Sequence, residues 1–194
     1  MNKKILIAIT LIAVVMMTIP VVAPVMAKRP KLPYSMGIIT VEQVEPSTEW
    51  VSGEKIVHGR GGITEYAMFA VPWGDGTSLT SGIMNYNMET LNGGGLGKTV
   101  DTYADGTIEG TINWRWTGAG LFVYGGPTFT IDGVTVEAGD MFGGLQLSGI
   151  AVKHGTSGVL EGLQMRGTFV GVVIMNGPLA LVGKMLSWET GTYW

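Results

Sequence analysis

The chain has 194 residues, contains no cysteine and only two histidines, and carries a net charge of −3. The lack of cysteine excludes disulfide bonds, and together with the scarcity of histidine it removes the usual zinc sites, so we expect no metal and no cofactor. The negative charge argues against a nucleic-acid partner, because proteins that bind phosphate backbones present basic surfaces.

The first 27 residues have the layout of an export signal. A short positive stretch with Lys3 and Lys4 precedes an uncharged run over residues 5–27. Pro20 and Pro24 favour cleavage, which would also remove both lysines and change the net charge to −5. The alternative is a retained membrane anchor, because a span requires about 20 apolar residues. The sequence therefore predicts a secreted or cell-surface protein, with membrane contact only through residues 5–27 if they are kept.

Residues 28–34 form a basic, proline-containing linker, and residues 35–194 are expected to form one all-β domain. All 31 glycines follow the leader, where they make up about one residue in five, against about 7% in average proteins. Strand signals alternate with turn signals, and no helical periodicity is sustained outside the leader. The candidate strands are residues 37–42, 63–71, 79–91, 107–117, 145–152, 159–175 and 179–188, with a short hairpin over 129–136.

The segment 107–117 alternates best between apolar and polar residues. Its apolar residues fall on one face of the predicted strand, and they are Ile108, Ile112, Trp114 and Trp116. Two tryptophans on one strand face each bury about 200 Å², so either the core or another subunit must cover them.

Turn signals and strand glycines together favour a barrel. Asp75-Gly76, Asp105-Gly106 and Asp132-Gly133 are typical of tight hairpin turns. Glycines within the candidate strands predict bulges or sharp bends, at Gly110, Gly149, Gly162, Gly167 and Gly171. A small closed sheet needs such bends to turn its corners. We therefore predict a single antiparallel, closed or nearly closed β-barrel of about eight strands.

The segment Gly155-Thr-Ser-Gly-Val-Leu-Glu-Gly-Leu-Gln-Met-Arg-Gly167 resembles the penultimate strand of barrels of the allene oxide cyclase and dirigent type. The resemblance covers residues 95–188 and depends mainly on glycine spacing. It implies an eight-stranded antiparallel barrel, often dimeric or trimeric, with an apolar pocket at one end for a small hydrophobic molecule. No functional residue of that family can be matched to a position in this chain.

Several residues are candidates for binding a ligand. Glu109 and Glu161 occupy equivalent places in the similar segments Gly106–Gly110 and Gly158–Gly162, although a glutamate in a strand is usually solvated. Arg115 and Arg166 could share the polar side of neighbouring strands with Glu109. This polar side faces either the barrel interior or water. The answer depends on what covers Trp114 and Trp116, which lie on the opposite face of the strand.

Some motifs are better explained by a structural role than by catalysis or binding. Residues 92–99 end in Gly-Lys-Thr like a phosphate-binding loop, but no helix follows, so we expect a flexible hairpin loop. His58 and His154 could each act as a general base, although a surface position is the usual one. No Gly-x-Ser-x-Gly motif is present to anchor a hydrolase triad.

The sequence predicts an exported barrel that binds a small hydrophobic ligand or a partner subunit. A second hypothesis is a cyclase or isomerase of the allene oxide cyclase type. A third is a small outer-membrane barrel, because the chain ends in Tyr193-Trp194 and eight strands is the lower limit of that class. A fourth is a structural surface module.

Overall fold

A computed structural model describes residues 29–194, so the predicted export segment at 1–27 lies outside the described residues. The first strand begins at Leu32, within the stretch expected to be a linker. Two 3-10 turns accompany the strands, and none of the helices among residues 29–194 is long and apolar enough to cross a bilayer. The elements are β1 (Leu32–Glu45), β2 (Thr48–Ser52), β3 (Ile56–Phe69), β4 (Gly76–Asn87), β5 (Asn92–Tyr103), β6 (Gly106–Val123), β7 (Phe129–Ile131), β8 (Val134–Val136), β9 (Met141–Gly155), η1 (Gly158–Leu160), β10 (Gln164–Asn176), η2 (Leu179–Leu181) and β11 (Met185–Tyr193).

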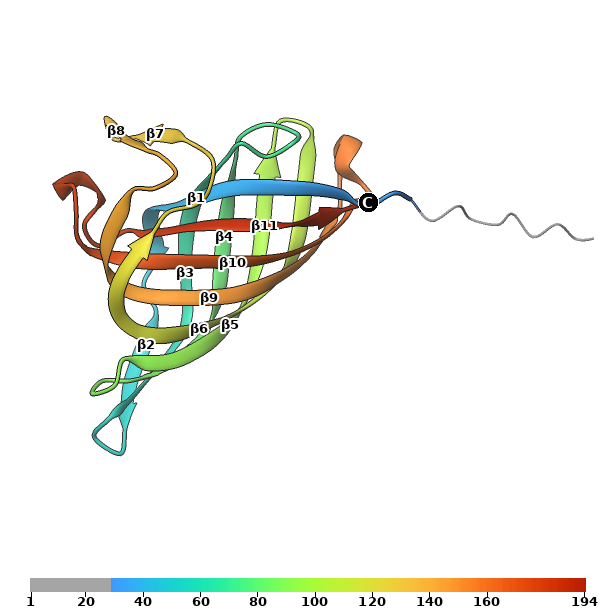
Figure 1. Cartoon of the computed structure of the whole chain (residues 1–194). Helices are drawn as coiled ribbons and strands as arrows, with labels where there is room; N and C mark the ends of the chain where they lie inside the picture. The colour runs from blue at the N-terminus through green and yellow to red at the C-terminus, as the bar shows by residue number, and fades with distance from the viewer. Residues whose placement is uncertain (1–28) are drawn as a thin grey trace, which may run out of the picture. The chain divides into compact units, whose positions relative to one another are not determined.

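Eight long strands form a closed antiparallel barrel (Figure 1). They pair in the order β1-β11-β10-β9-β6-β5-β4-β3, and β3 pairs back with β1 to close the ring. This confirms the predicted fold class. The short strand β2 pairs with β3 beyond the end of β1, so the sheet extends there as a lip.

One end of the barrel interior is filled by side chains, and the other end is open. The filled end lies where β1 begins and β11 ends, and its packing is completed by the turn at Trp73 and by η1. Its buried residues are Tyr34, Met36, Met68, Val71, Tyr103, Ile108, Leu160 and Met165. We call the opposite end, where the β2–β3 and β4–β5 hairpins project, the mouth.

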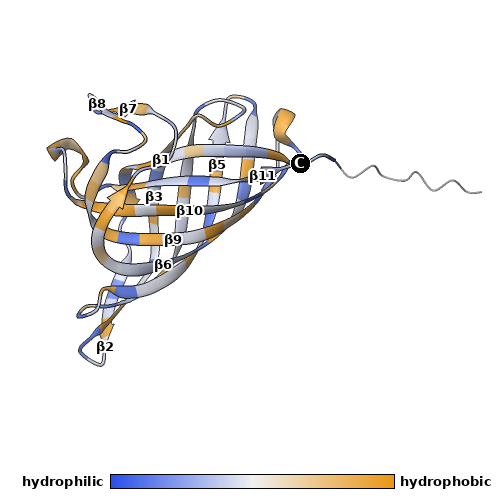
Figure 2. Cartoon of the chain, viewed as in Figure 1, coloured by the Kyte–Doolittle hydropathy of each residue, from blue (hydrophilic) through white to orange (hydrophobic). Residues whose placement is uncertain are grey.

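A second core lies on the outside of the barrel. The connection between β6 and β9 contains the β7–β8 hairpin, which packs over the outer faces of β1, β10 and β11. Tyr124, Val136 and Ile174 are completely buried there, and Figure 2 shows hydrophobic residues on the hairpin and on adjacent strand ends. The predicted turn is confirmed, because Asp132 and Gly133 both adopt positive φ angles, of 50° and 76°.

The strand glycines provide space and do not mark bulges. Gly110, Gly149, Gly167 and Gly171 lie in continuous pairing, and the register shifts fall elsewhere. A Cβ atom on Gly149 would lie 2.3 Å from the ring of Phe169 and from a backbone oxygen. The prediction of bulges at these positions was wrong, because the closed barrel needs room inside for large side chains. The fifth position, Gly162, lies in a turn with a φ of 80°.

The glycine-rich segment at residues 92–99 is a strand and not the flexible loop expected from its composition. It forms most of β5, with β4 on one side and β6 on the other. The glycine nearest its middle, Gly95, lies against the indole of Trp114, which would meet an added Cβ atom at 2.2 Å. Hydrogen bonds to the two neighbouring strands and contact with the Trp114 ring therefore fix this glycine-rich segment in place.

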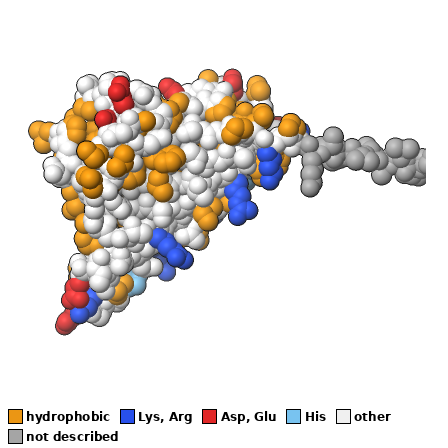
Figure 3. Space-filling view, viewed as in Figure 1, with side chains coloured by type: hydrophobic (Ala, Val, Ile, Leu, Met, Phe, Trp, Pro, Cys, Tyr) orange, Lys and Arg blue, Asp and Glu red, His pale blue; other side chains and the backbone are white. Residues whose placement is uncertain are grey.

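The outer surface of the barrel is mixed in character. Figure 3 shows hydrophobic side chains scattered over one side of this face and lysine and arginine side chains along another edge. Among the most exposed large hydrophobic residues are Leu121, Met141, Met175 and Leu179, with exposed fractions of 63%, 64%, 65% and 89%.

The role of the interior glycines can be tested within one strand. We predict that Gly149→Ala lowers the free energy of unfolding by about 1–3 kcal/mol, because overpacking displaces Phe169 or the backbone. Gly143→Ala in the same strand is the control, since its nearest neighbour would be at 3.3 Å, and it should have a smaller effect. Urea unfolding measures both; equal effects would contradict the explanation.

Candidate functional site

The open half of the barrel encloses a cavity of about 220 Å³. It begins near the mouth, at residues such as Gln43 and Ser47, and extends inward between the strands. Large apolar and aromatic side chains form most of its wall, among them Tyr66, Ile112, Trp114, Trp116, Leu147 and Phe169. A cavity of this kind suits a small molecule whose body is apolar.

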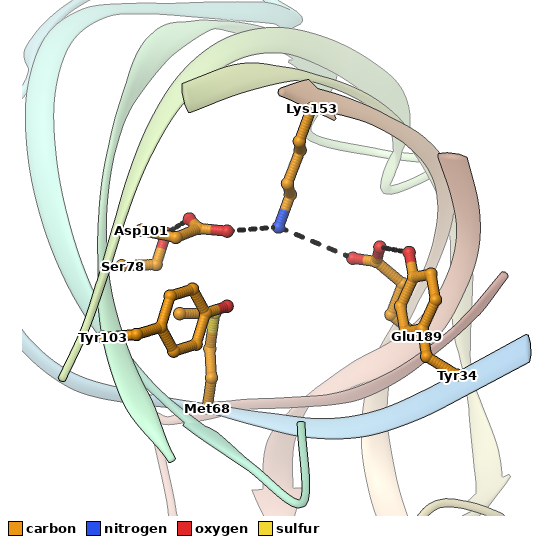
Figure 4. Close-up of polar contacts among 7 residues, drawn as sticks. All are labelled: Tyr34, Met68, Ser78, Asp101, Tyr103, Lys153 and Glu189. Atoms are coloured by element: carbon orange, nitrogen blue, oxygen red, sulfur yellow. Dashed lines mark hydrogen bonds and ion pairs between the residues drawn. The ribbon is translucent and has the colours of Figure 1, made fainter. Parts of the chain in front are cut away.

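The inner end of the cavity is formed by a network of buried charged groups (Figure 4). The Lys153 ammonium donates to Oδ2 of Asp101 at 2.8 Å and lies 3.8 Å from Oε2 of Glu189. The three residues are between 0% and 3% exposed. Lys153 and Glu189 line the cavity, so we call this network the floor.

Neighbouring hydroxyl groups complete the floor. Ser78 donates to Oδ1 of Asp101 at 2.6 Å, and the Tyr34 hydroxyl donates to Oε1 of Glu189. Each carboxylate therefore has one hydroxyl donor in addition to the ammonium. With two carboxylates and one ammonium, the floor has a formal charge of −1.

The strand order places these groups on three sides of the barrel. Lys153 lies on β9, which is separated from β5 by β6 and from β11 by β10. Its ammonium can therefore reach Asp101 and Glu189 on opposite walls. The lysine side chain crosses Gly110 on β6, where a Cβ atom would lie 2.5 Å from its Cγ atom, so glycine is needed at that position.

Burial and charge shift the proton equilibria of the floor. Burial alone lowers the pKa of Lys153, but the negative charges of Asp101 and Glu189 outweigh it and raise the pKa well above its ordinary value. Burial, together with the neighbouring carboxylates, raises the pKa of Tyr34 and of Tyr103. At neutral pH the lysine is therefore a cation and not a nucleophilic amine, and both phenols are protonated.

Two of the six candidate residues from the sequence lie at the cavity. Trp114 and Trp116 line it, and Ile108 and Ile112 lie on the same inner side of β6, as the alternation predicted. Arg115 and Glu109 are exposed on the outer side of the same strand. The polar side of this strand therefore faces water and not the barrel interior.

The remaining candidates also lie outside the cavity. Arg166 is exposed on the outer side of β10. Glu161 is exposed in the turn after η1, whereas Glu109 lies in a long strand, so the two similar glycine segments have different structures. The four charged candidates are not brought together with the tryptophans.

The histidines also lie away from the cavity. His58 contacts Ser52 through Nε2 at 2.6 Å and Asn85 through Nδ1 at 2.5 Å, and the indole of Trp50 stacks on its ring. These contacts hold the imidazole on the outer side of the lip. His154 is exposed beside the buried Lys153.

The sequence pattern did not identify the three charged residues of the floor. Each stands beside an apolar residue, such as Val100 or Val152, that a simple alternation pattern would place inside. The structure places both valines outside, with exposed fractions of 42% and 50%. The available signal was the glycines, because Asp101 has the same strand parity as Gly95 and Gly97, and all three face inward.

No residues in the described part of the chain suggest a metal centre. Within residues 29–194, no three or more histidine, aspartate or glutamate side chains are grouped so that they could hold a metal ion. The floor instead has the Lys153 ammonium between its two acidic groups. The chemistry that the floor offers is hydrogen bonding and proton transfer.

The charge balance of the floor can be tested with Lys153→Met. We predict that this change lowers the free energy of unfolding by about 3–5 kcal/mol at pH 7, because it leaves two buried carboxylates without their cation. Lys98→Met, on the exposed side of β5, is the control and should change stability by less than about 0.5 kcal/mol.

Alkaline pH should destabilise the barrel. The folded-state pKa values of Tyr34, Tyr103 and Lys153 are all raised, so the folded chain retains protons that the unfolded chain releases near pH 10. Their contribution to stability is complete below about pH 10 and is lost as the pH rises further. Urea unfolding with tyrosinate absorbance checks this; ionisation of all six tyrosines before unfolding would disprove it.

Comparisons with protein-family models, with curated proteins and with solved structures find no match. The resemblance to barrels of the allene oxide cyclase and dirigent type therefore stays a prediction. The function must be argued from the cavity and its floor.

Proposed function

We propose that this barrel acts outside the cytoplasm and binds a small, mainly apolar ligand in its central cavity. The observation that carries the proposal is the cavity itself. Buried side chains pack together at one end of the barrel, whereas the other end keeps a cavity of about 220 Å³. A barrel that needed only a stable core could fill this space with larger side chains, since interiors normally pack without such voids.

The chemistry of the wall supports an apolar ligand. Trp114, Trp116 and Phe169 offer flat surfaces, and the methionines Met68, Met84 and Met185 add flexible ones. Aromatic rings contribute large contact areas, and methionine adapts to irregular apolar shapes. Such a ligand would bury its body against this wall.

A second candidate function, a cyclase or isomerase, is favoured by the ionisable groups at the floor. A cationic donor such as Lys153 beside the carboxylate of Glu189 is an arrangement that can polarise a carbonyl group and move a proton. The test is conversion of a bound unsaturated ketone, and Glu189→Gln should abolish it while leaving binding intact. Binding without any conversion would favour ligand binding as the only function.

A small outer-membrane barrel has less support. Charged side chains, among them Glu109, Arg115 and Arg166, lie on the outer sides of β6 and β10, where a membrane barrel would present lipid-facing apolar residues. A structural surface module and association with a second copy of the chain both stay predictions.

Ligand binding can be measured with a hydrophobic fluorophore whose emission rises on burial. We expect saturable binding at one site, and at least a tenfold loss of affinity in Thr80→Phe, because Thr80 lines the cavity and a phenyl ring would occupy it. Thr111→Phe, on the exposed side of β6, is the matched control and should bind normally. Equal binding by both variants would place the fluorophore elsewhere and contradict the proposal.

A further inference from the structure

Two hydroxyl groups lie on the mouth side of the two carboxylates of the floor. β5 and β11 both run from the mouth toward the filled end, so Thr99 and Ser187 lie two residues closer to the mouth than Asp101 and Glu189 and face the same side of their strands. Both residues line the cavity, and they are only 3% and 1% exposed. A ligand that enters from the mouth therefore meets these neutral hydroxyl groups before it meets the two carboxylates.

These hydroxyl groups lack partners within the described residues. Neither Oγ1 of Thr99 nor Oγ of Ser187 forms a hydrogen bond there, and the indole nitrogen of Trp114, in the same cavity wall, also has none. A buried polar group without a partner costs about 1–3 kcal/mol. Three such atoms around one cavity indicate that the partner comes from outside the chain.

The charges of the floor disfavour an ionic ligand. Both carboxylates already accept hydrogen bonds. Asp101 accepts them from Ser78 and Lys153, and Glu189 accepts one from Tyr34. An anionic head group would approach a network with a formal charge of −1. A cationic head group would approach the Lys153 ammonium and could not accept a hydrogen bond from the indole. Either ion would also lose its hydration in an apolar cavity.

We propose that the ligand is a neutral amphiphile whose hydroxyl or carbonyl oxygens hydrogen-bond to Thr99 and Ser187. This inference rests on the binding function proposed above. The two residues belong to strands on opposite walls, so a head group at the inner end of the cavity can be approached by a hydroxyl group from either side. The apolar remainder of the molecule lies along the tryptophans toward the mouth.

The test compares ten-carbon probes that share an apolar chain and differ in the head group. Displacement of the fluorophore is measured at pH 7 for 1-decanol, 1,2-decanediol, decanoate and decylammonium. We expect the two neutral probes to bind at least tenfold more tightly than both ions. Equal or tighter binding of decanoate or decylammonium overturns this inference but leaves the binding function intact. Failure of the fluorophore and of every probe to bind overturns the function itself.

Two isosteric variants locate the head group. Thr99→Val and Ser187→Ala should each weaken decanol binding about threefold to tenfold, the effect of one hydrogen bond, once the fluorophore affinity of each variant has been measured directly. Both remove an unpartnered hydroxyl, so they should fold at least as well as the parent, which circular dichroism verifies. Thr111→Val on the outer surface is the control. Unchanged decanol affinity in both cavity variants would overturn the assignment.

Discussion

A single ammonium group joins opposite walls of the barrel, and the rest of the interior is arranged around it. Lys153 extends between Asp101 on β5 and Glu189 on β11. The contact forms only if every strand between the three residues keeps its register. A wrong register would leave a buried ion without its partner, which costs several kcal/mol. A slip of any one of these three strands by one residue would turn its charged side chain outward and break the network. The network therefore separates the filled half of the barrel from the half that contains the cavity.

The fold distributes its hydrophobic residues between two cores. The inner core closes one end, and the outer core lies beneath the β7–β8 hairpin. Because the outer core contributes stability independently of the interior, the mouth half of the barrel can remain open without the loss of all apolar burial. Interior glycines such as Gly95 and Gly149 serve the same arrangement, since they let aromatic rings lie across the sheet. Aromatic rings can line the cavity because the residues beside them on neighbouring strands are glycines.

The candidate site was only partly predictable from the sequence. The alternation in β6 correctly placed Trp114 and Trp116 together, because one strand is sufficient to define a common face. The same pattern could not identify Asp101 or Lys153. Their exposed neighbours Val100 and Val152 are apolar, so polarity and burial are inverted there. Which face is inner depends on the pairing of each strand with two others, and this information is not local.

The sequence by itself determined that the chain forms an antiparallel β-barrel, since short-range alternation, turn dipeptides and glycine content are properties of neighbouring residues. It also determined the β7–β8 turn, because the Asp132–Gly133 pair adopts the positive φ angles that such a turn requires. Only the tertiary structure decided that residues 92–99 are a strand, that the interior contains a cavity, and that three charged side chains meet at the inner end of this cavity. Each of these depends on strands brought together from distant parts of the chain, where packing and charge compensation outweigh local preference.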